Sequence, residues 1–296
     1  MFEYDEMFFF SLLLGFLARA LMLKIDYRQF PSYPHSYVIH LTLGAIAAAL
    51  GALVIPLLLE KEFIAITFIT IAAQQFRDVR SMERESLAKI EKTELIPRGE
   101  AYIEGIAKLF EARNYLALIS SFTTNLIYYY SNWYIALLGG SLVAYGLHSF
   151  MKGPTVGDIA DVEVVEISIK KKSIGIDEVI MMNVGEEEAL EIWSREGIGV
   201  KIIPRDEDAR ATLANLGQRQ AILHDLSILM GIKLDLGLQH FSPLARLNID
   251  NGSLNIIFIP QEPDEIFIKE AVERIPVLES SQRKPLKDKI GRKAAD

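Results

Sequence analysis

Apolar runs in the first half of this 296-residue chain constrain its fold more than any other feature. A helix needs around 20 apolar residues to cross about 30 Å of hydrocarbon, because it rises 1.5 Å per residue. Runs near that length cover residues 7–23, 38–59, 63–76, 115–130 and 133–150. The third run is short and could be re-entrant, and any single run could be a buried core helix. Together they predict an α-helical bundle of about five transmembrane helices, because a soluble protein of this size has little room to bury them all.

The distribution of lysine and arginine predicts an orientation for that bundle. Connections on the cytoplasmic side of a membrane are enriched in these residues. The N-terminal tail has none, and the connection 24–37 contains Lys24 and Arg28. The connection 77–114 carries the largest group, which consists of Arg77, Arg80, Arg84, Lys89, Lys92, Arg98, Lys108 and Arg113. With five spans, these charges predict a multi-pass protein with its N-terminus outside and its C-terminal half in the cytoplasm.

Small and polar residues within the runs carry two further expectations. Gly44, Ala48 and Ala52 recur at every fourth position, a spacing that lets helices approach closely. They either pack inside one bundle or form a homodimer. Polar residues around Asn125 could line a path for a small solute, although no Asp or Glu falls within the predicted spans.

The second half of the chain has the composition of a soluble domain. Apolar and polar residues alternate over 162–169, as in a half-buried strand. The runs 179–184 and 200–203 predict strands on either side of a helix over 186–197. This order favours a parallel pair with a right-handed crossover. Asp206 is expected to cap a long helix that follows, to about residue 230.

The end of this domain contains a turn sequence, Asp250-Asn251-Gly252, between two apolar runs. It predicts a β-hairpin of strands 246–249 and 254–259, and a last helix is expected over 264–274. The sequence therefore predicts a membrane domain over 1–152 with an amphipathic cytoplasmic loop, then a soluble α/β (α+β) domain over 153–279. The remainder, 280–296, is polar and charged and is expected to be disordered.

Composition limits the partners and the chemistry. The net charge is −8 without a basic stripe, which argues against nucleic acid. The chain has no cysteine, so disulfides, thiolate catalysis and cysteine metal sites are excluded. His224 and Asp225 are adjacent on a helix and point apart, so they predict no metal site. No phosphate-binding glycine loop occurs, and no cofactor is expected.

The connection 77–114 contains two helical patterns separated by residues 93–99, where Pro97 and Gly99 interrupt them. The second pattern is amphipathic. Its polar face carries Glu100, Glu104, Lys108 and Glu111, and its apolar face carries Tyr102, Ile103, Ile106, Leu109 and Phe110. The pattern predicts a docking helix that lies along the inner leaflet or packs on the C-terminal domain. In an alternative interpretation, Glu104 is a recognition or catalytic carboxylate.

The residues Tyr102-Ile103-Glu104-Gly105-Ile106-Ala107 spell YIEGIA, and the chain resembles the YIEGIA family of polytopic membrane proteins from endospore-forming bacteria. Length and hydropathy layout fit the family over the whole chain. The resemblance implies a bacterial cell membrane and a role in sporulation, in building the spore envelope. It implies no catalytic residue.

Asp250-Asn251-Gly252 also resembles the Asp-Thr/Ser-Gly of aspartic proteases, in which paired aspartates share a proton and activate water. Five spans before a cytoplasmic domain further resemble the membrane-anchored aspartic protease that matures a sporulation sigma factor. However, Asn251 replaces the usual hydroxyl residue, and a single motif would require a homodimer to form the pair. A hairpin turn is the simpler interpretation.

These features favour a non-enzymatic function for the chain. It would be a sporulation-associated scaffold or regulator in the lipid bilayer, whose cytoplasmic domain binds a sporulation protein. The first alternative is a membrane-anchored protease that uses Asp250, and also Glu104, as catalytic carboxylates. The second alternative is a small-solute transporter with a polar path around Asn125.

Overall fold

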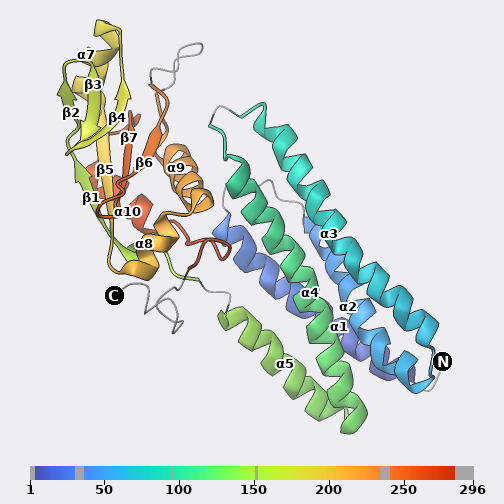
Figure 1. The fold of residues 1–296 in the computed structure, drawn as a ribbon. Helices are drawn as coiled ribbons and strands as arrows, with labels where there is room; N and C mark the ends of the chain where they lie inside the picture. Colours follow the sequence, from blue (N-terminus) through green and yellow to red (C-terminus); the bar gives the residue numbers. More distant parts are fainter. Residues whose placement is uncertain (1–3, 31–36, 95, 151–152, 234–240, 284–296) are drawn as a thin grey trace. The chain divides into compact units, whose positions relative to one another are not determined.

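The computed structural model describes residues 4–30, 37–94, 96–150, 153–233 and 241–283 (Figure 1). These residues form two compact units. The first unit lies within Met1–Leu87 and Ile106–Lys152, and the second within Ala88–Gly105 and Gly153–Asp296. Each unit has buried apolar clusters of its own.

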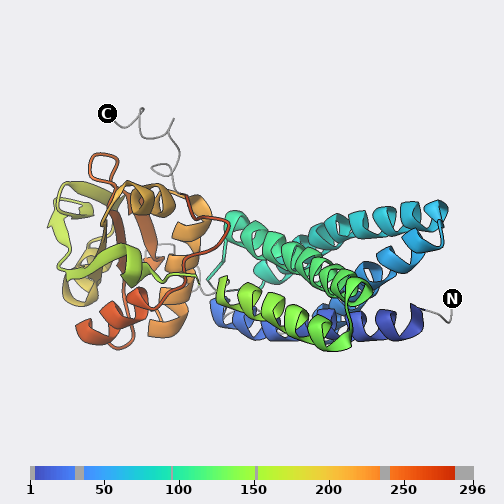
Figure 2. The same cartoon turned by 90° about the horizontal axis from the view of Figure 1, so that it is seen from below.

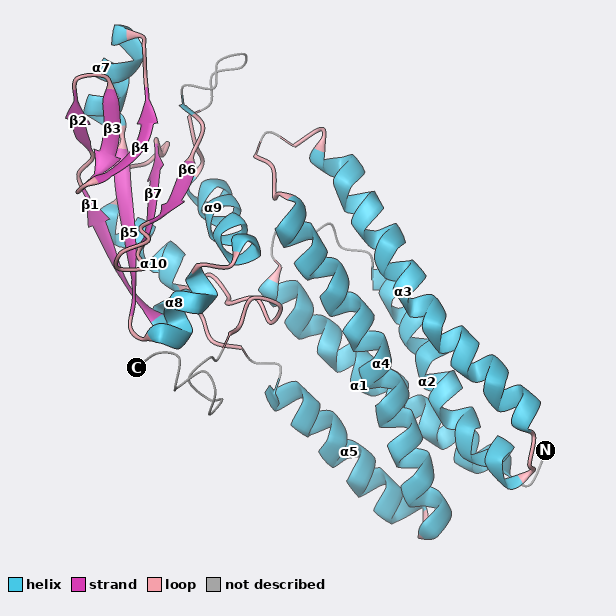
Figure 3. Cartoon of the chain, in the orientation of Figure 1, coloured by secondary structure: helices cyan, strands magenta, loops and turns pink. Residues whose placement is uncertain are grey.

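The first unit is made of helices (Figure 3). Their bounds are α1 Asp5–Gln29, α2 Tyr37–Leu59, α3 Phe63–Glu91, α4 Glu100–Tyr130 and α5 Trp133–Phe150, and α4 begins in the second unit. Small residues let the backbones approach closely. A Cβ atom added to Gly51 would lie 2.2 Å from the Leu118 carbonyl oxygen, so α2 and α4 touch at that position.

The small residues at every fourth position of α2 pack inside the unit. A Cβ atom on Gly44 would lie 2.4 Å from Cγ of Arg19, and Ala48 and Ala52 are fully buried. They therefore serve contacts within one chain, the first of the two interpretations made from the sequence.

The expectation of about five transmembrane spans is wrong. Within the described part of the chain, two helices are long and apolar enough to cross a bilayer, over Asp5–Tyr27 and Tyr37–Leu59. The apolar part of α5, Trp133–Leu147, is shorter. The long helices α3 and α4 each join apolar turns to charged turns, and no stretch of either is both long and apolar enough. By length and composition, the chain has two candidate membrane helices.

The orientation deduced from five spans fails for the same reason. Two crossings return a chain to the side from which it started. An N-terminus outside and a C-terminal half in the cytoplasm therefore cannot both hold with α1 and α2 as the spans.

The region 77–114 is helical over most of its length and is not a loop. Its first part continues α3 to Glu91, and its last part belongs to α4, which starts at Glu100. The connection between these helices is thus limited to residues 92–99. The predicted docking helix and the apolar run 115–130 form one continuous helix of 31 residues, because no Pro or Gly-rich break separates them.

The division between the units differs from the expected domain boundaries. Residues 88–105 belong to the second unit together with residues from Gly153 onward. Packing also extends past residue 279, since Ser281 is fully buried and its Oγ donates a hydrogen bond to Oε1 of Gln218 at 2.9 Å. Most of the tail that was expected to be disordered, residues 284–296, lies outside the described residues.

The second unit contains two antiparallel sheets, seen in perpendicular views in Figures 1 and 2. The larger has the order β1-β5-β7-β6, with bounds Ala160–Val165, Ile198–Pro204, Leu254–Phe258 and Leu244–Leu247. The smaller has the order β2-β3-β4, with bounds Ser168–Lys170, Ser173–Ile176 and Val179–Asn183. The helices are α6 Val156–Ile159, α7 Glu187–Glu196, α8 Glu207–Leu213, α9 Leu216–Met230 and α10 Glu265–Glu273.

The central strand β7 carries the core of this unit. All five of its residues are buried. Ile256 and Phe258 belong to a cluster with residues of α9 and α10, whereas Ile257 belongs to a cluster with Trp193 of α7. A strand that is covered on both faces needs a continuous apolar run, and this one has it apart from Asn255.

Two sequence predictions for this unit are wrong. The strands on either side of α7, β4 and β5, lie in different sheets and form no parallel pair, because β5 pairs antiparallel with β1 and β7. The long helix after Asp206 is two helices. Asp206 caps α8, and Asn215 then caps α9 by accepting hydrogen bonds from two backbone N–H groups. The hairpin of β6 and β7 and the last helix, α10, are confirmed.

Candidate functional site

The start of α4 packs on α9 within the second unit. Gln220 lies on α9, and its Oε1 accepts hydrogen bonds from the backbone N–H groups of Ala101 and Tyr102, each at 3.1 Å. The first N–H groups of a helix have no partner inside that helix. Gln220 therefore caps α4 from a position more than a hundred residues away in the sequence.

Gly99 makes this approach possible. Its φ of +88° is in the region that favours glycine. A Cβ atom at Gly99 would lie 2.3 Å from Nε2 of Gln220, so a larger residue would push the capping side chain away. Its backbone N–H donates to Oε1 of Glu91 at 2.6 Å.

His224, one turn further along α9, holds the connection before α4. Its Nδ1 lies 3.0 Å from the carbonyl oxygen of Ile96. Burial, and then the nearby charge of Arg98, lower the pKa of His224 to about 4, so the ring is neutral at pH 7. A carbonyl oxygen only accepts hydrogen bonds, so Nδ1 must carry the proton. The Tyr102 ring meets the His224 ring edge-on, with centroids 6.1 Å apart.

The six residues of the YIEGIA sequence are divided between the units. Tyr102 and Ile103 are buried in the second unit, and Glu104 is half-buried. A Cβ atom on Gly105 would lie 2.9 Å from Oγ of Ser280. The last two residues of the motif, Ile106 and Ala107, belong to the first unit and are fully buried. The structure identifies α9 as the element against which the motif helix begins, which the pattern alone did not indicate.

Asp250 lies in the exposed turn of the β6–β7 hairpin. Its backbone N–H donates to Oδ1 of Asn248 at 2.9 Å, and Arg210 donates to the carbonyl oxygens of Ile249 and Asp250 at 2.8 and 3.3 Å. Among the described residues, its carboxylate shares no hydrogen bond with a second carboxylate. The arrangement is that of a hydrogen-bonded turn.

The polar residues around Asn125 make contacts between helices. Nδ2 of Asn125 donates to the carbonyl oxygen of Ala52 at 2.8 Å, and Oγ of Ser121 donates to the carbonyl oxygen of Ser11 at 3.0 Å. Asn125, Ser121 and Ser11 are fully buried. These bonds join α4 to α2 and α1, so the polar group has a structural use.

A buried charge cluster joins α1 and α4 in the first unit. Oδ1 of Asp26 accepts from Nε of Arg113 at 2.8 Å, and Oδ2 accepts from Nη1 of Arg19 at 3.2 Å. All three side chains are at most 2% exposed. Asp26 lies inside the candidate span Asp5–Tyr27, beyond the apolar run that the sequence marked as a span. Charges at such depth need partners, and these three supply one another.

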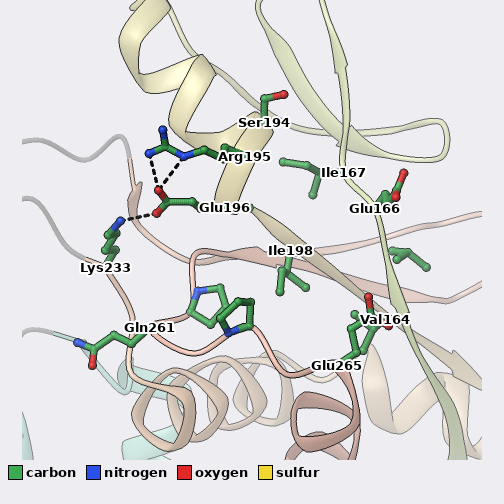
Figure 4. A pocket seen from close by; sticks show the side chains of 14 residues that line it. Val164, Glu166, Ile167, Ser194, Arg195, Glu196, Ile198, Lys233, Gln261 and Glu265 are labelled. Carbon is green, nitrogen blue, oxygen red and sulfur yellow. Dashed lines mark hydrogen bonds and ion pairs between the residues drawn. The ribbon is translucent and has the colours of Figure 1, made fainter.

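A cleft of about 730 Å³ lies on the second unit (Figure 4). Separate segments line it: the end of β1 and the residues after it, the end of α7 with the start of β5, and the residues around Pro260. Apolar side chains on its walls include Val164, Ile167, Ile198, Pro260 and Pro263. Charged side chains of both signs, Glu166, Arg195, Glu196, Lys233 and Glu265, complete the lining.

Glu196 is the electrostatic centre of this cleft. Lys233 and Arg195 hold its carboxylate from two sides, with Nη2 of Arg195 at 2.6 Å from Oε1 (Figure 4). The hydrogen bond from Lys233, and then that from Arg195, lower the pKa of Glu196 below its usual range. The cleft thus presents a fixed carboxylate flanked by two cations.

The sequence alone did not indicate these cleft residues. They come from separate parts of the chain and form no short motif. Alternation of apolar residues marks Val164 and Ile198 as strand residues, but only the pairing of the strands brings them to one opening.

Comparison with known proteins agrees with the resemblance noted from the motif. The sequence matches the family described as YIEGIA protein over residues 7–288. It is 40% identical over 271 residues to the uncharacterized protein YphB of Bacillus subtilis (strain 168), covering 92% of this chain and 91% of that protein. No solved structure matches the chain significantly. The chain is therefore a member of the YIEGIA protein family.

Proposed function

We propose that this protein is a membrane-associated scaffold or regulator whose second unit holds a segment of a partner protein in the cleft around Glu196. The observation that carries the proposal is the composition of that cleft. Apolar walls bury side chains, and paired charges at an opening select the sequence that enters. A volume of about 730 Å³ suits a short peptide segment.

The first unit supplies the link to the membrane in this proposal. α1 and α2 have the length and composition of membrane helices. The basic residues that follow them, including Arg77, Arg80 and Arg84, favour the cytoplasmic side for the chain after α2. Since two crossings restore the starting side, the N-terminus would also be cytoplasmic. Reporter fusions at both ends test this placement, and activity of an exported reporter at either end would contradict it.

The role in sporulation is part of the same proposal. The family resemblance implies it, and the similar protein YphB belongs to Bacillus subtilis. The partner would then be a protein that is present while the spore envelope is assembled.

Site-specific photo-crosslinking in sporulating cells tests the cleft. A photoreactive residue at Gln261, which lines the cleft, is compared with the same residue at Asn251 in the exposed hairpin turn. We expect one defined adduct from position 261 and none from position 251. The exchange Lys233→Glu should abolish the adduct, because it replaces a cation beside Glu196 with a second anion. Equal adducts from both positions, or an adduct that survives Lys233→Glu, would contradict binding in the cleft.

The same cells separate a scaffold from a protease. The variants Asp250→Ala and Glu104→Gln should yield the same intact partner in the same amount as the wild type. Recovery of an intact partner with either variant, beside shorter fragments with the wild type, would identify a protease instead.

A further inference from the structure

The turn between α4 and α5 gathers exposed aromatic side chains. Tyr129, Tyr130, Trp133 and Tyr134 fall within six consecutive residues and are 43%, 79%, 46% and 60% exposed. The rings form two pairs: Trp133 stacks on Tyr134 with centroids 3.6 Å apart, and Tyr129 meets Tyr130 edge-on at 5.0 Å. So much aromatic surface in water is unfavourable unless a partner covers it.

Hydrogen bonds set the shape of this aromatic turn. Oδ1 of Asn132 accepts from the backbone N–H of Ile135 at 3.1 Å and so caps α5. Oγ of Ser131 donates to the carbonyl oxygen of Ile127 at 2.5 Å. The turn therefore presents its rings in a defined arrangement before any partner binds.

The turn lies at the level where the candidate span in α1 begins. α4 runs antiparallel to α1, since Arg113 bonds to Asp26 and Ser121 bonds to Ser11. Phe10 contacts Tyr128 with ring centroids 5.6 Å apart. Phe10 is five residues from the start of the span at Asp5, or about 8 Å along the helix. The residues after Tyr128 therefore lie near the boundary between hydrocarbon and water.

The surface next to the turn is apolar and uncharged. Ile135, Leu138, Leu142 and Tyr145 are exposed along one face of α5. The chain has no charged residue between Arg113 and Lys152. Tyrosine and tryptophan favour the lipid–water interface, because their rings enter the apolar layer while the hydroxyl or indole N–H stays hydrated.

We propose that the aromatic turn Tyr129–Tyr134 binds the lipid–water interface of the bilayer and sets the depth of the first unit. This inference rests on the membrane association proposed above. It requires no span by α4 or α5, because the rings enter only the headgroup layer. The occupant of this exposed surface is lipid, which is already at the same level along α1.

The two tryptophans of the chain permit a direct test. Trp193 is fully buried in the second unit, and Trp133 is in the aromatic turn. In the variant Trp193→Phe, all tryptophan emission comes from Trp133. In the variant Trp133→Phe, it comes from Trp193, which serves as the matched control. If Trp193→Phe does not fold, the difference between wild type and Trp133→Phe gives the same signal.

The full-length protein is reconstituted in phosphatidylcholine vesicles whose acyl chains are brominated at defined depths. We expect Trp133 to lose more emission with bromine near the headgroups than with bromine near the chain ends. It should also lose little emission to iodide in the buffer. Trp193 should lose no emission to either brominated lipid.

Three results would overturn the inference. Quenching by iodide without lipid quenching would place the turn in water. Absence of both would show that protein covers it, for example a second copy of the chain. Strongest quenching by bromine near the chain ends would place it in the bilayer interior. Flotation of the protein with the vesicles is measured first, because failure to float would contradict membrane association itself, whereas flotation without lipid quenching contradicts only this inference.

Discussion

The side chain of Gln220 accepts a hydrogen bond from the backbone N–H of Tyr102 at 3.1 Å and one from the preceding residue. A residue of α9 thereby completes the first turn of α4, the helix in which the YIEGIA sequence starts. The variant Gln220→Ala should lower the free energy of unfolding of the second unit by about 1 kcal/mol, the usual cost of losing a helix cap.

The matched variant Gln220→Glu keeps an accepting oxygen and adds a negative charge at the positive end of α4. It should retain most of the stability. Hydrogen exchange of the amides of Ala101 and Tyr102 provides the local measurement. Equal protection of these amides in Gln220→Ala and wild type would show that the cap contributes nothing.

Gly99→Ala should destabilise the same contact more strongly. The new Cβ atom would meet the Gln220 side chain and would force an alanine to adopt a φ of +88°. Such a conformation costs on the order of 1–3 kcal/mol for a residue other than glycine. Gly185→Ala is the control, because nothing lies within 4 Å of a Cβ atom there. Urea unfolding of both variants gives the comparison, and equal midpoints would contradict the role of Gly99.

The second unit should lose stability as the pH falls from about 6.5 to about 4. The folded pKa of His224 is about 4, below its unfolded value of 6.5, so the unfolded chain binds the proton first. A shift of this size corresponds to a loss of roughly 3 kcal/mol at the acidic end and to no loss above the unfolded pKa. His224→Gln removes the titrating group. Denaturation curves between pH 7.5 and 4 should therefore be flatter for the variant, and parallel curves would refute the assignment.

Asp26→Asn should destabilise the first unit by about 3–5 kcal/mol, because it leaves Arg19 and Arg113 buried without their anion. Asp78→Asn changes an exposed carboxylate in the same unit and should have little effect. Thermal unfolding in detergent compares the two. A melting temperature of Asp26→Asn equal to that of Asp78→Asn would mean that the cluster does not stabilise the fold.

Local patterns in the sequence were sufficient to predict many individual elements. The turn Asp250-Asn251-Gly252 predicts the hairpin of β6 and β7, and Asp264 marks the start of α10, because turns and caps depend on residues close together in the chain. The apolar runs predict where helices occur in the first unit. They do not predict how far each helix continues, since α3 and α4 extend into charged sequence without a break.

The functional surfaces depend on contacts between distant residues. By itself, the sequence determined the family through six consecutive residues, the positions of most helices and the hairpin, all of which follow from near neighbours. Only the tertiary structure decided that β4 and β5 lie in different sheets, that Asp26 pairs with Arg19 and Arg113, and that Glu196 meets Lys233 in a cleft. Strand pairing and the partners of buried charges are determined by the packing of the whole unit, which no local pattern contains.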